Sequence, residues 1–221
     1  MTRAAPTALW ILLAMSLSAQ IAWNARPGAP RLAEEALPPA PRAPVLRLAA
    51  FGETSAAARL TMLYLQAFDL RELDYARLID WLRAVLQVDP RSQYPLFAAA
   101  RIYAEHPDPA RSRQMLEFIY EQFQLDPNRR WPWLAHAALL AKHRLKDLAL
   151  ARRYAAAVDR QTTAADVPLW ARQMEIFIAE DMNELDAARI MLGGLLASGK
   201  ITDPAELAFL KQRLEALETR R

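Results

Sequence analysis

The chain has 221 residues, with 28 Lys and Arg against 25 Asp and Glu and a formal net charge of +3. Its 53% hydrophobic content excludes a disordered chain, its 5 glycines argue against a β-rich fold, and the lack of cysteine excludes disulfides and thiolate metal sites. Because the basic residues are spread among the acids without a basic stripe, the sequence predicts no nucleic-acid partner.

The N-terminal residues 8–23, ALWILLAMSLSAQIAW, form an apolar stretch without a charge. As a helix this stretch would be roughly 24 Å long, and Trp10 and Trp23 would lie near the two membrane interfaces. The sequence therefore predicts a transmembrane signal anchor over residues 1–23, with the membrane contacted through residues 8–23. The alternative is a secretory signal peptide that is cleaved near the small residues 16–19.

The orientation of such an anchor depends on the charges that flank it. Arg3 precedes the apolar stretch, and a short basic N-terminus favours the cytoplasmic side. Arg26, Arg31 and Arg42 follow the stretch and weaken this signal. We expect a single-pass protein of a bacterial inner membrane with its bulk in the periplasm.

Prolines dominate the next segment, residues 24–44. They stand at positions 27, 30, 38, 39, 41 and 44, and such a run excludes helix and central strand. At about 3.1 Å per residue the segment would be an extended linker of roughly 60 Å at most. The sequence therefore predicts a Pro/Ala-rich linker over residues 24–44 and a folded domain over residues 45–221.

The rest of the chain repeats with a step of 37 residues. LQVDPRSQYPLF begins at Leu86 and FQLDPNRRWPWL begins at Phe123, and both combine an Asp-Pro with an aromatic-Pro pair. The same step relates Trp133 to Trp170. Self-similarity at such a period predicts helical hairpins that stack into a solenoid.

Apolar residues recur at intervals of three and four, which predicts two helices in each repeat. The last predicted helix begins at Asp203-Pro204 and ends near residue 218, and its single apolar face suits a solenoid end cap. The sequence thus predicts an all-α fold of about four hairpins plus a C-terminal capping helix. The predicted hairpins cover residues 55–67 and 75–88, 94–105 and 109–125, 131–143 and 147–159, and 169–181 and 185–198.

These repeats resemble the tetratricopeptide repeat (TPR) family over residues 55–219, although the period is 37 rather than about 34 residues. The resemblance implies that Trp133, Trp170, Tyr103 and Phe177 pack in the core between helices. The pattern of a large, a small and an aromatic residue on that family's first helix is matched by Leu96, Ala100 and Tyr103, by Trp133, Ala137 and Leu140, and, with Met174 at the small position, by Trp170, Met174 and Phe177.

The same resemblance implies that the chain binds a protein partner through a concave groove lined by the first helix of each repeat. The alternative for Tyr94 and Trp131 is that they only pack the turns before their helices. Tyr, Trp and Arg are the residue types most enriched at binding hot spots. Carried over by position, the groove would contain Tyr94, Phe97, Arg101, Trp131, Leu134, Ala171 and Glu175.

No motif in the sequence predicts catalysis. Residues 194–200, GLLASGK, lack the hydroxyl residue that a P-loop needs after its Lys. His136 and His143 share a helix face without a carboxylate at ligand spacing. We therefore expect no enzyme, cofactor, metal or small-molecule substrate. The expected role is a membrane-tethered scaffold or adaptor in a bacterial envelope complex, and the alternative is a secreted periplasmic chaperone or accessory factor.

Overall fold

The computed structural model of the protein describes residues 7–24, 36–69, 73–182, 184–199 and 201–219. Within these ranges the regular structure is helical, which confirms the all-α prediction. The helices are α1 (Thr7–Asn24), α2 (Ala43–Ala49), α3 (Thr54–Leu65), α4 (Tyr75–Val88), α5 (Tyr94–Arg101), the 3-10 turn η2 (Tyr103–Glu105), α6 (Pro109–Leu125), α7 (Pro127–His143), α8 (Leu148–Gln161), α9 (Leu169–Asp181), α10 (Leu185–Ala197) and α11 (Pro204–Thr219).

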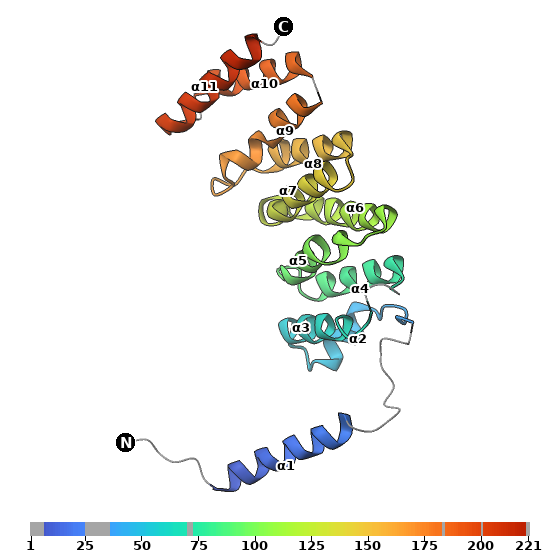
Figure 1. The fold of residues 1–221 in the computed structure, drawn as a ribbon. Helices are drawn as coiled ribbons and strands as arrows, with labels where there is room; N and C mark the ends of the chain where they lie inside the picture. Colours follow the sequence, from blue (N-terminus) through green and yellow to red (C-terminus); the bar gives the residue numbers. More distant parts are fainter. Residues whose placement is uncertain (1–6, 25–35, 70–72, 183, 200, 220–221) are drawn as a thin grey trace, which may run out of the picture.

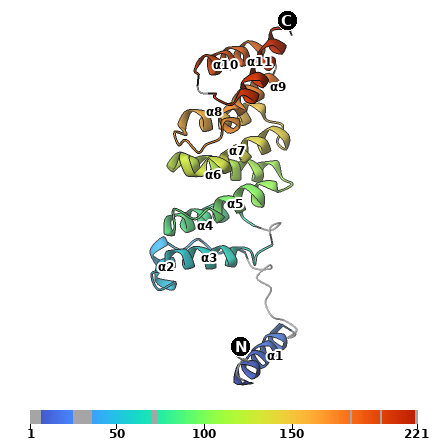
Figure 2. The same cartoon turned by 90° about the vertical axis from the view of Figure 1, so that its left-hand side faces the viewer.

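Helices α3 to α11 stack in chain order as antiparallel hairpins, an arrangement typical of an α-solenoid (Figure 1). The odd-numbered helices α3, α5, α7, α9 and α11 follow one side of the stack, and the even-numbered helices follow the other (Figures 1 and 2). Helices on the same side of the stack also contact each other directly: α5 packs on α7, α7 on α9, and α4 on α6.

Aspartate caps explain why several second helices begin where they do. The carboxylates of Asp74, Asp108 and Asp147 each accept a hydrogen bond of 2.9 Å from a backbone N–H in the first turn of α4, α6 and α8. Such caps satisfy N–H groups that have no partner inside the helix. The predicted bounds of α4, α6 and α9 agree with the structure, and α5 ends at Arg101 and continues as a 3-10 turn.

Helix α7 begins at Pro127, four residues before the predicted start. Proline is favoured in the first turn because its missing N–H has no helical partner there. Pro132 lies further inside, where it leaves the carbonyl of Asn128 without its helical N–H donor. The side chain of Asn128 accepts hydrogen bonds from the backbone of Thr163 and Ala164, 2.8 and 3.0 Å away, and so fixes this longer helix start to the next loop.

The buried side chains form two clusters. The larger cluster runs from the segment before α2 to α9 and contains the fully buried Tyr103 and Tyr154. The smaller cluster joins α9, α10 and α11 through residues such as Ile176, Leu192 and Leu210. Helix α9 is the element that both clusters share, since Met174 and Ile178 belong to the larger one.

Polar contacts join each hairpin to the next at nearly one repeat's distance in sequence. Arg83 binds Glu121 at 2.6 Å across 38 residues. The hydroxyl of Tyr154 donates to Glu117 at 3.1 Å across 37 residues. Contacts of this kind occur on both sides of the stack: the two above join even-numbered helices, and the ion pairs of Lys142 with Asp181 and of Arg213 with Glu180 join odd-numbered ones.

The C-terminal end of the predicted linker is part of the folded domain, so the predicted boundary at residue 45 is too late. Leu37 is only 3% exposed, and its carbonyl accepts a hydrogen bond of 2.8 Å from Arg77. The indole N–H of Trp81 donates to the carbonyl of Pro38, also at 2.8 Å. We call residues 36–42 the strap; its prolines keep it extended while its carbonyls accept hydrogen bonds from α4. Residues 25–35 of the predicted linker lie outside the described residues.

Helix α1 coincides with the apolar stretch for which the sequence predicts a transmembrane segment. Its described side chains, from Trp10 to Trp23, are all exposed. Within the described ranges, no helix combines the length and the apolar character that crossing a bilayer requires.

Candidate protein-binding surface

Within the hairpins from α3 to α11, most of the large exposed apolar side chains lie on the odd-numbered helices. The second helices contribute Leu125, at the end of α6, and Ile190, in α10, among their described residues, and a further exposed group, Val45, Leu48 and Phe51, lies on α2 and the turn after it. Isolated exposed apolar residues are common on proteins, so the informative feature here is their concentration on one set of helices. We call this surface the odd-helix face; its large apolar members are Leu60 and Leu63 on α3, Tyr94 and Phe97 on α5, Leu139 on α7, Trp170 on α9 and Phe209 on α11.

Aromatic contacts join neighbouring helices along this face. Tyr94 stacks on Phe97 with ring centroids 6.1 Å apart, and Phe97 meets the edge of Trp133 at 5.9 Å. Trp131 meets Trp170 in the same edge-to-face manner at 5.7 Å. Such pairs are favourable arrangements of aromatic rings. They connect α5 to α7 and α7 to α9, so the face is continuous across three hairpins.

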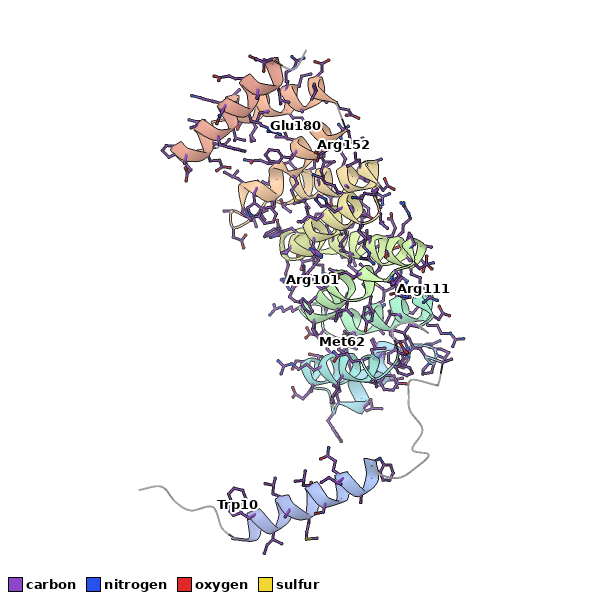
Figure 3. The ribbon with its side chains drawn as sticks, in the orientation of Figure 1. Trp10, Met62, Arg101, Arg111, Arg152 and Glu180 are labelled. Carbon is purple, nitrogen blue, oxygen red and sulfur yellow. The ribbon has the colours of Figure 1, made fainter. Side chains whose placement is uncertain are left out.

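Three of the predicted groove residues lie on the odd-helix face. Tyr94 and Phe97 are 39% and 40% exposed, and Arg101 is exposed one turn beyond Phe97. Figure 3 shows Arg101 on the side of the odd-numbered helices and Arg111 on the opposite side. Trp131 is half-buried because it packs against Trp170.

Leu134 and Ala171 do not belong to the face, because both are fully buried. Glu175 is also buried, and its carboxylate binds Arg152 at 3.3 Å and Arg160 at 3.6 Å, which joins α8 to α9. The positional transfer from the family pattern is therefore wrong for these three residues. Leu134 and Ala171 pack the core, and Glu175 makes ion pairs between helices.

The errors have a common cause in the rotation of the helices. Phe97, Leu134 and Ala171 occupy one repeat position, yet Phe97 is exposed while the other two are buried. At the position before, the exposure is reversed, since Leu96 is buried and Trp170 is 54% exposed. Neighbouring residues point about 100° apart around a helix, so α9 is rotated relative to α5 and turns the other repeat position toward the core. Because Trp170 is exposed, the prediction that it packs in the core is wrong.

Trp133 and Tyr103 behave differently from Trp170. Tyr103 is buried, in agreement with the prediction, and its backbone carbonyl accepts a hydrogen bond of 2.8 Å from the hydroxyl of Tyr75. Trp133 is half-buried, and its indole N–H donates to the side-chain carbonyl of Gln93 at 2.6 Å. This bond fixes the ring beside Phe97 and completes the aromatic contact between α5 and α7.

His136 lies next to this aromatic contact, on α7. Its Nε2 atom is buried without a hydrogen-bond partner among the described residues. Burial lowers the pKa of His136, and the nearby positive charge of Arg101 lowers it further. The imidazole is therefore held neutral, which suits a packing position beneath the face.

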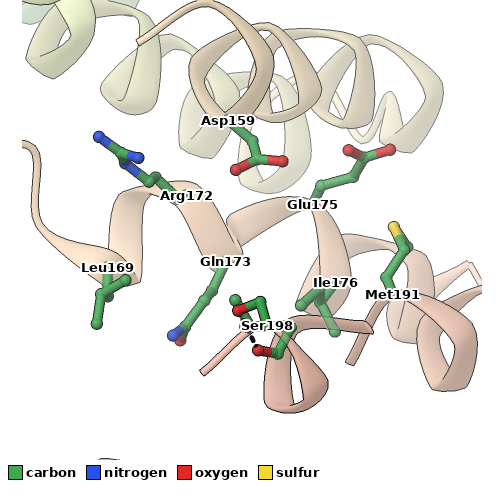
Figure 4. A pocket seen from close by; sticks show the side chains of 9 residues that line it. Asp159, Leu169, Arg172, Gln173, Glu175, Ile176, Met191 and Ser198 are labelled. Atoms are coloured by element: carbon green, nitrogen blue, oxygen red, sulfur yellow. Dashed lines mark hydrogen bonds between the residues drawn. The ribbon is translucent and has the colours of Figure 1, made fainter. Parts of the chain in front are cut away.

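A separate pocket of about 280 Å³ lies between α8, α9 and α10 (Figure 4). Part of its polar lining is engaged within the protein, although Nε of Arg172 is buried without a hydrogen-bond partner among the described residues. Gln173 donates to Glu206 at 2.7 Å, Arg172 donates to the carbonyl of Ala164 at 2.8 Å, and Glu175 makes the ion pairs described above. This pocket is thus a gap between packed hairpins, where Asp159 and Nε of Arg172 are the lining groups without a described partner.

Comparison of the chain with models of known protein families, with curated proteins and with solved structures finds no match. In the part of the chain that the structure describes, no group of three or more His, Asp and Glu side chains is placed to hold a metal ion. The odd-helix face is therefore the surface on which a functional proposal can be built.

Proposed function

We propose that this protein is a scaffold or adaptor that binds another protein through the odd-helix face of a TPR-like solenoid. The observation that carries the proposal is the concentration of exposed apolar side chains on α3, α5, α7, α9 and α11. Such a surface keeps apolar area in contact with water, which is unfavourable, unless a partner covers it. Aromatic residues at its centre are the type that dominates binding energy at protein interfaces.

We further propose that residues 8–23 attach the solenoid to a membrane, so that the protein serves as an accessory subunit of a bacterial envelope complex. Support comes from α1, which carries no charge and exposes apolar side chains such as Trp10, Leu12 and Met15. Such a surface is unfavourable in water and favourable in an apolar environment. The alternative role is that of a secreted accessory factor, in which signal peptidase removes this segment.

Cross-linked affinity capture from solubilised membranes tests the binding proposal. The test variant is Leu63→Ser with Phe97→Ser, which removes two large side chains from the odd-helix face. The control is Leu125→Ser with Ile190→Ser, which removes two apolar side chains from second helices that are more exposed than those of the test variant. We expect the test variant to lose proteins that the wild type and the control retain.

Two results would contradict the proposal. One is an identical set of captured proteins for wild type, test and control, which would show that this face is not used. The other is loss in the control alone, which would move the binding surface to the even-numbered helices. The N-terminal sequence of the mature protein separates the tethered form from the cleaved one.

A further inference from the structure

Charge is distributed unequally between the two sides of the first three hairpins. The odd-numbered helices α3, α5 and α7 contain no Asp or Glu, and their basic residues are Arg59, Arg101, Arg129, Arg130 and Lys142. The even-numbered helices α4, α6 and α8 carry both signs, with acids at Asp80, Glu117, Glu121 and Asp159. Within their bounds, α3, α5 and α7 thus carry only positive charge, and the nearest acids in sequence, Glu53, Glu105 and Asp126, flank these helices.

The acids of the even-numbered helices are mostly engaged with neighbouring arginines. Glu121 and Asp80 bind Arg83, and Glu117 binds Arg153. These carboxylates cannot neutralise the odd-helix face, because they are already paired on the other side of the stack. Their partners help to join one hairpin to the next, as the ion pairs of Lys142 with Asp181 and of Arg213 with Glu180 do on the odd-numbered helices.

On the odd-numbered helices, some basic residues are paired and two are not. Arg129 pairs with Asp126, and Lys142 pairs with Asp181. Arg130 is buried and donates to backbone carbonyls. Arg59 and Arg101 are exposed and make no ion pair with any residue that the structure describes. These two guanidinium groups are therefore available to an external carboxylate.

We call the exposed side chains of Arg59, Leu63, Tyr94, Phe97 and Arg101 the path; it extends over α3 and α5, with one arginine on α3 and the other at the C-terminal end of α5. Arg59 is one turn from Leu63 on α3, and Phe97 is one turn from Arg101 on α5. Between them, the amide of Gln66 contacts the hydroxyl of Tyr94, and Tyr94 stacks on Phe97. The path thus has an apolar centre and a positive charge at each end. An apolar centre with a charged rim is the usual composition of a protein interface.

We propose that the partner binds this path through an acidic amphipathic segment, with apolar side chains on Leu63, Tyr94 and Phe97 and carboxylates on Arg59 and Arg101. This inference rests on the proposed protein-binding function and adds the chemistry of the partner. Complementary charge at an interface accelerates association and selects the partner. A nucleic acid would be a poorer match for this face. Its continuous phosphate backbone binds a row of free cations, whereas the path offers two arginines with apolar residues between them.

The test uses a synthetic helical peptide in which leucines form one face and glutamates cover the rest. A second peptide carries lysine in place of every glutamate. The full chain, with α1 covered by a nanodisc of neutral phosphatidylcholine, is held on a sensor surface by a C-terminal tag, and empty nanodiscs give the blank. We expect the glutamate peptide to bind and the lysine peptide to fail. Raising the salt concentration should weaken binding, because exposed charges are screened.

The decisive variant is Arg59→Glu with Arg101→Glu. Its matched control is Lys146→Glu with Lys211→Glu, which makes the same change in net charge at two exposed positions outside α3 and α5. We expect the arginine variant to bind the glutamate peptide about tenfold more weakly and the control to bind it as the wild type does. Gain of binding to the lysine peptide by the arginine variant would show that the variant is folded and that charge decides the preference.

The remaining outcomes separate this inference from the function on which it rests. If Leu63→Ser with Phe97→Ser abolishes capture of the native partner but the arginine variant does not, protein binding stands and the acidic partner is overturned. Failure of the glutamate peptide to bind, or equal weakening by the lysine control, also overturns it. Arginine-dependent binding to anionic vesicles or single-stranded DNA, without binding to the peptide, would replace the acidic protein segment with a different class of partner.

Discussion

Replacing Leu37 in the strap by alanine measures how firmly residues 36–42 belong to the folded domain. Leu37 is 3% exposed, and leucine-to-alanine changes at buried sites cost about 2–5 kcal/mol. The strap lies at the end of the domain, where neighbouring chain can move into part of the space. We therefore expect the free energy of unfolding to fall by about 2 kcal/mol, at the lower end of that range.

Urea unfolding of the full chain, followed by circular dichroism at 222 nm in a non-ionic detergent, gives this free energy. Leu48→Ala is the matched control, because Leu48 is 81% exposed on the adjacent helix α2. Its effect should stay within about 0.5 kcal/mol, as for most surface substitutions. Equal midpoints for Leu37→Ala and the wild type would refute the packed strap and restore a linker that ends at residue 44.

Three further results follow from individual contacts. Tyr75→Phe removes the hydrogen bond to the carbonyl of Tyr103 and should cost about 1 kcal/mol in urea unfolding. Trp170→Ala should lower the free energy of unfolding by only about 1 kcal/mol, because half of the side chain is exposed. A loss of about 3–5 kcal/mol, as for a core tryptophan, would show that the ring is buried. The hydrogen bond from Leu150 N–H lowers the pKa of the Asp147 carboxyl in the folded protein. The ionised carboxylate therefore stabilises the fold at pH values above its ordinary pKa of about 4, and this stabilisation is lost as the pH falls through the lower pKa of the folded state. Asp147→Asn should flatten this acid-side decline in the thermal midpoint, and an unchanged decline would exclude the cap as its source.

Local chemistry made the helices predictable from the sequence. An aspartate before α4, α6 and α8 supplies the acceptor that begins each helix, and Pro109 and Pro204 occupy first positions in α6 and α11. The apolar spacing of three and four then gives the length of each helix. These signals act within a few residues, so no knowledge of the tertiary structure is needed to read them.

The burial of individual residues on these helices could not be predicted in the same way. Phe97 and Leu134 occupy the same repeat position, but α7 starts earlier than α5 and turns a different side toward the core. Such rotation is set by packing against the neighbouring helices, which the sequence pattern does not encode. The strap was missed for a related reason, since a proline-rich segment looks the same whether it is free or held by Trp81.

The candidate surface was predicted only in part. Tyr94, Phe97 and Arg101 follow from the family resemblance, which places the groove on the first helix of each repeat, and the structure shows that all three are exposed. Leu60 and Leu63 were missed, because a leucine on a helix gives no indication of whether it faces the core or the solvent. The one available signal was the absence of acidic residues from α3, α5 and α7, which becomes informative once these helices are known to lie on the same side.

The division of the core at α9 has a mechanical consequence for the C-terminal end of the stack. Helices α10 and α11 pack on α9 through the smaller cluster, which holds none of the residues of the larger one, so they can detach from α9 as a unit while the larger cluster stays closed. Amide hydrogens in α10 and α11 should then exchange faster than those in α4 to α8. Since α3 and α5 lie at the far end of the array, such opening would shorten the solenoid without disturbing the aromatic and arginine residues near its beginning.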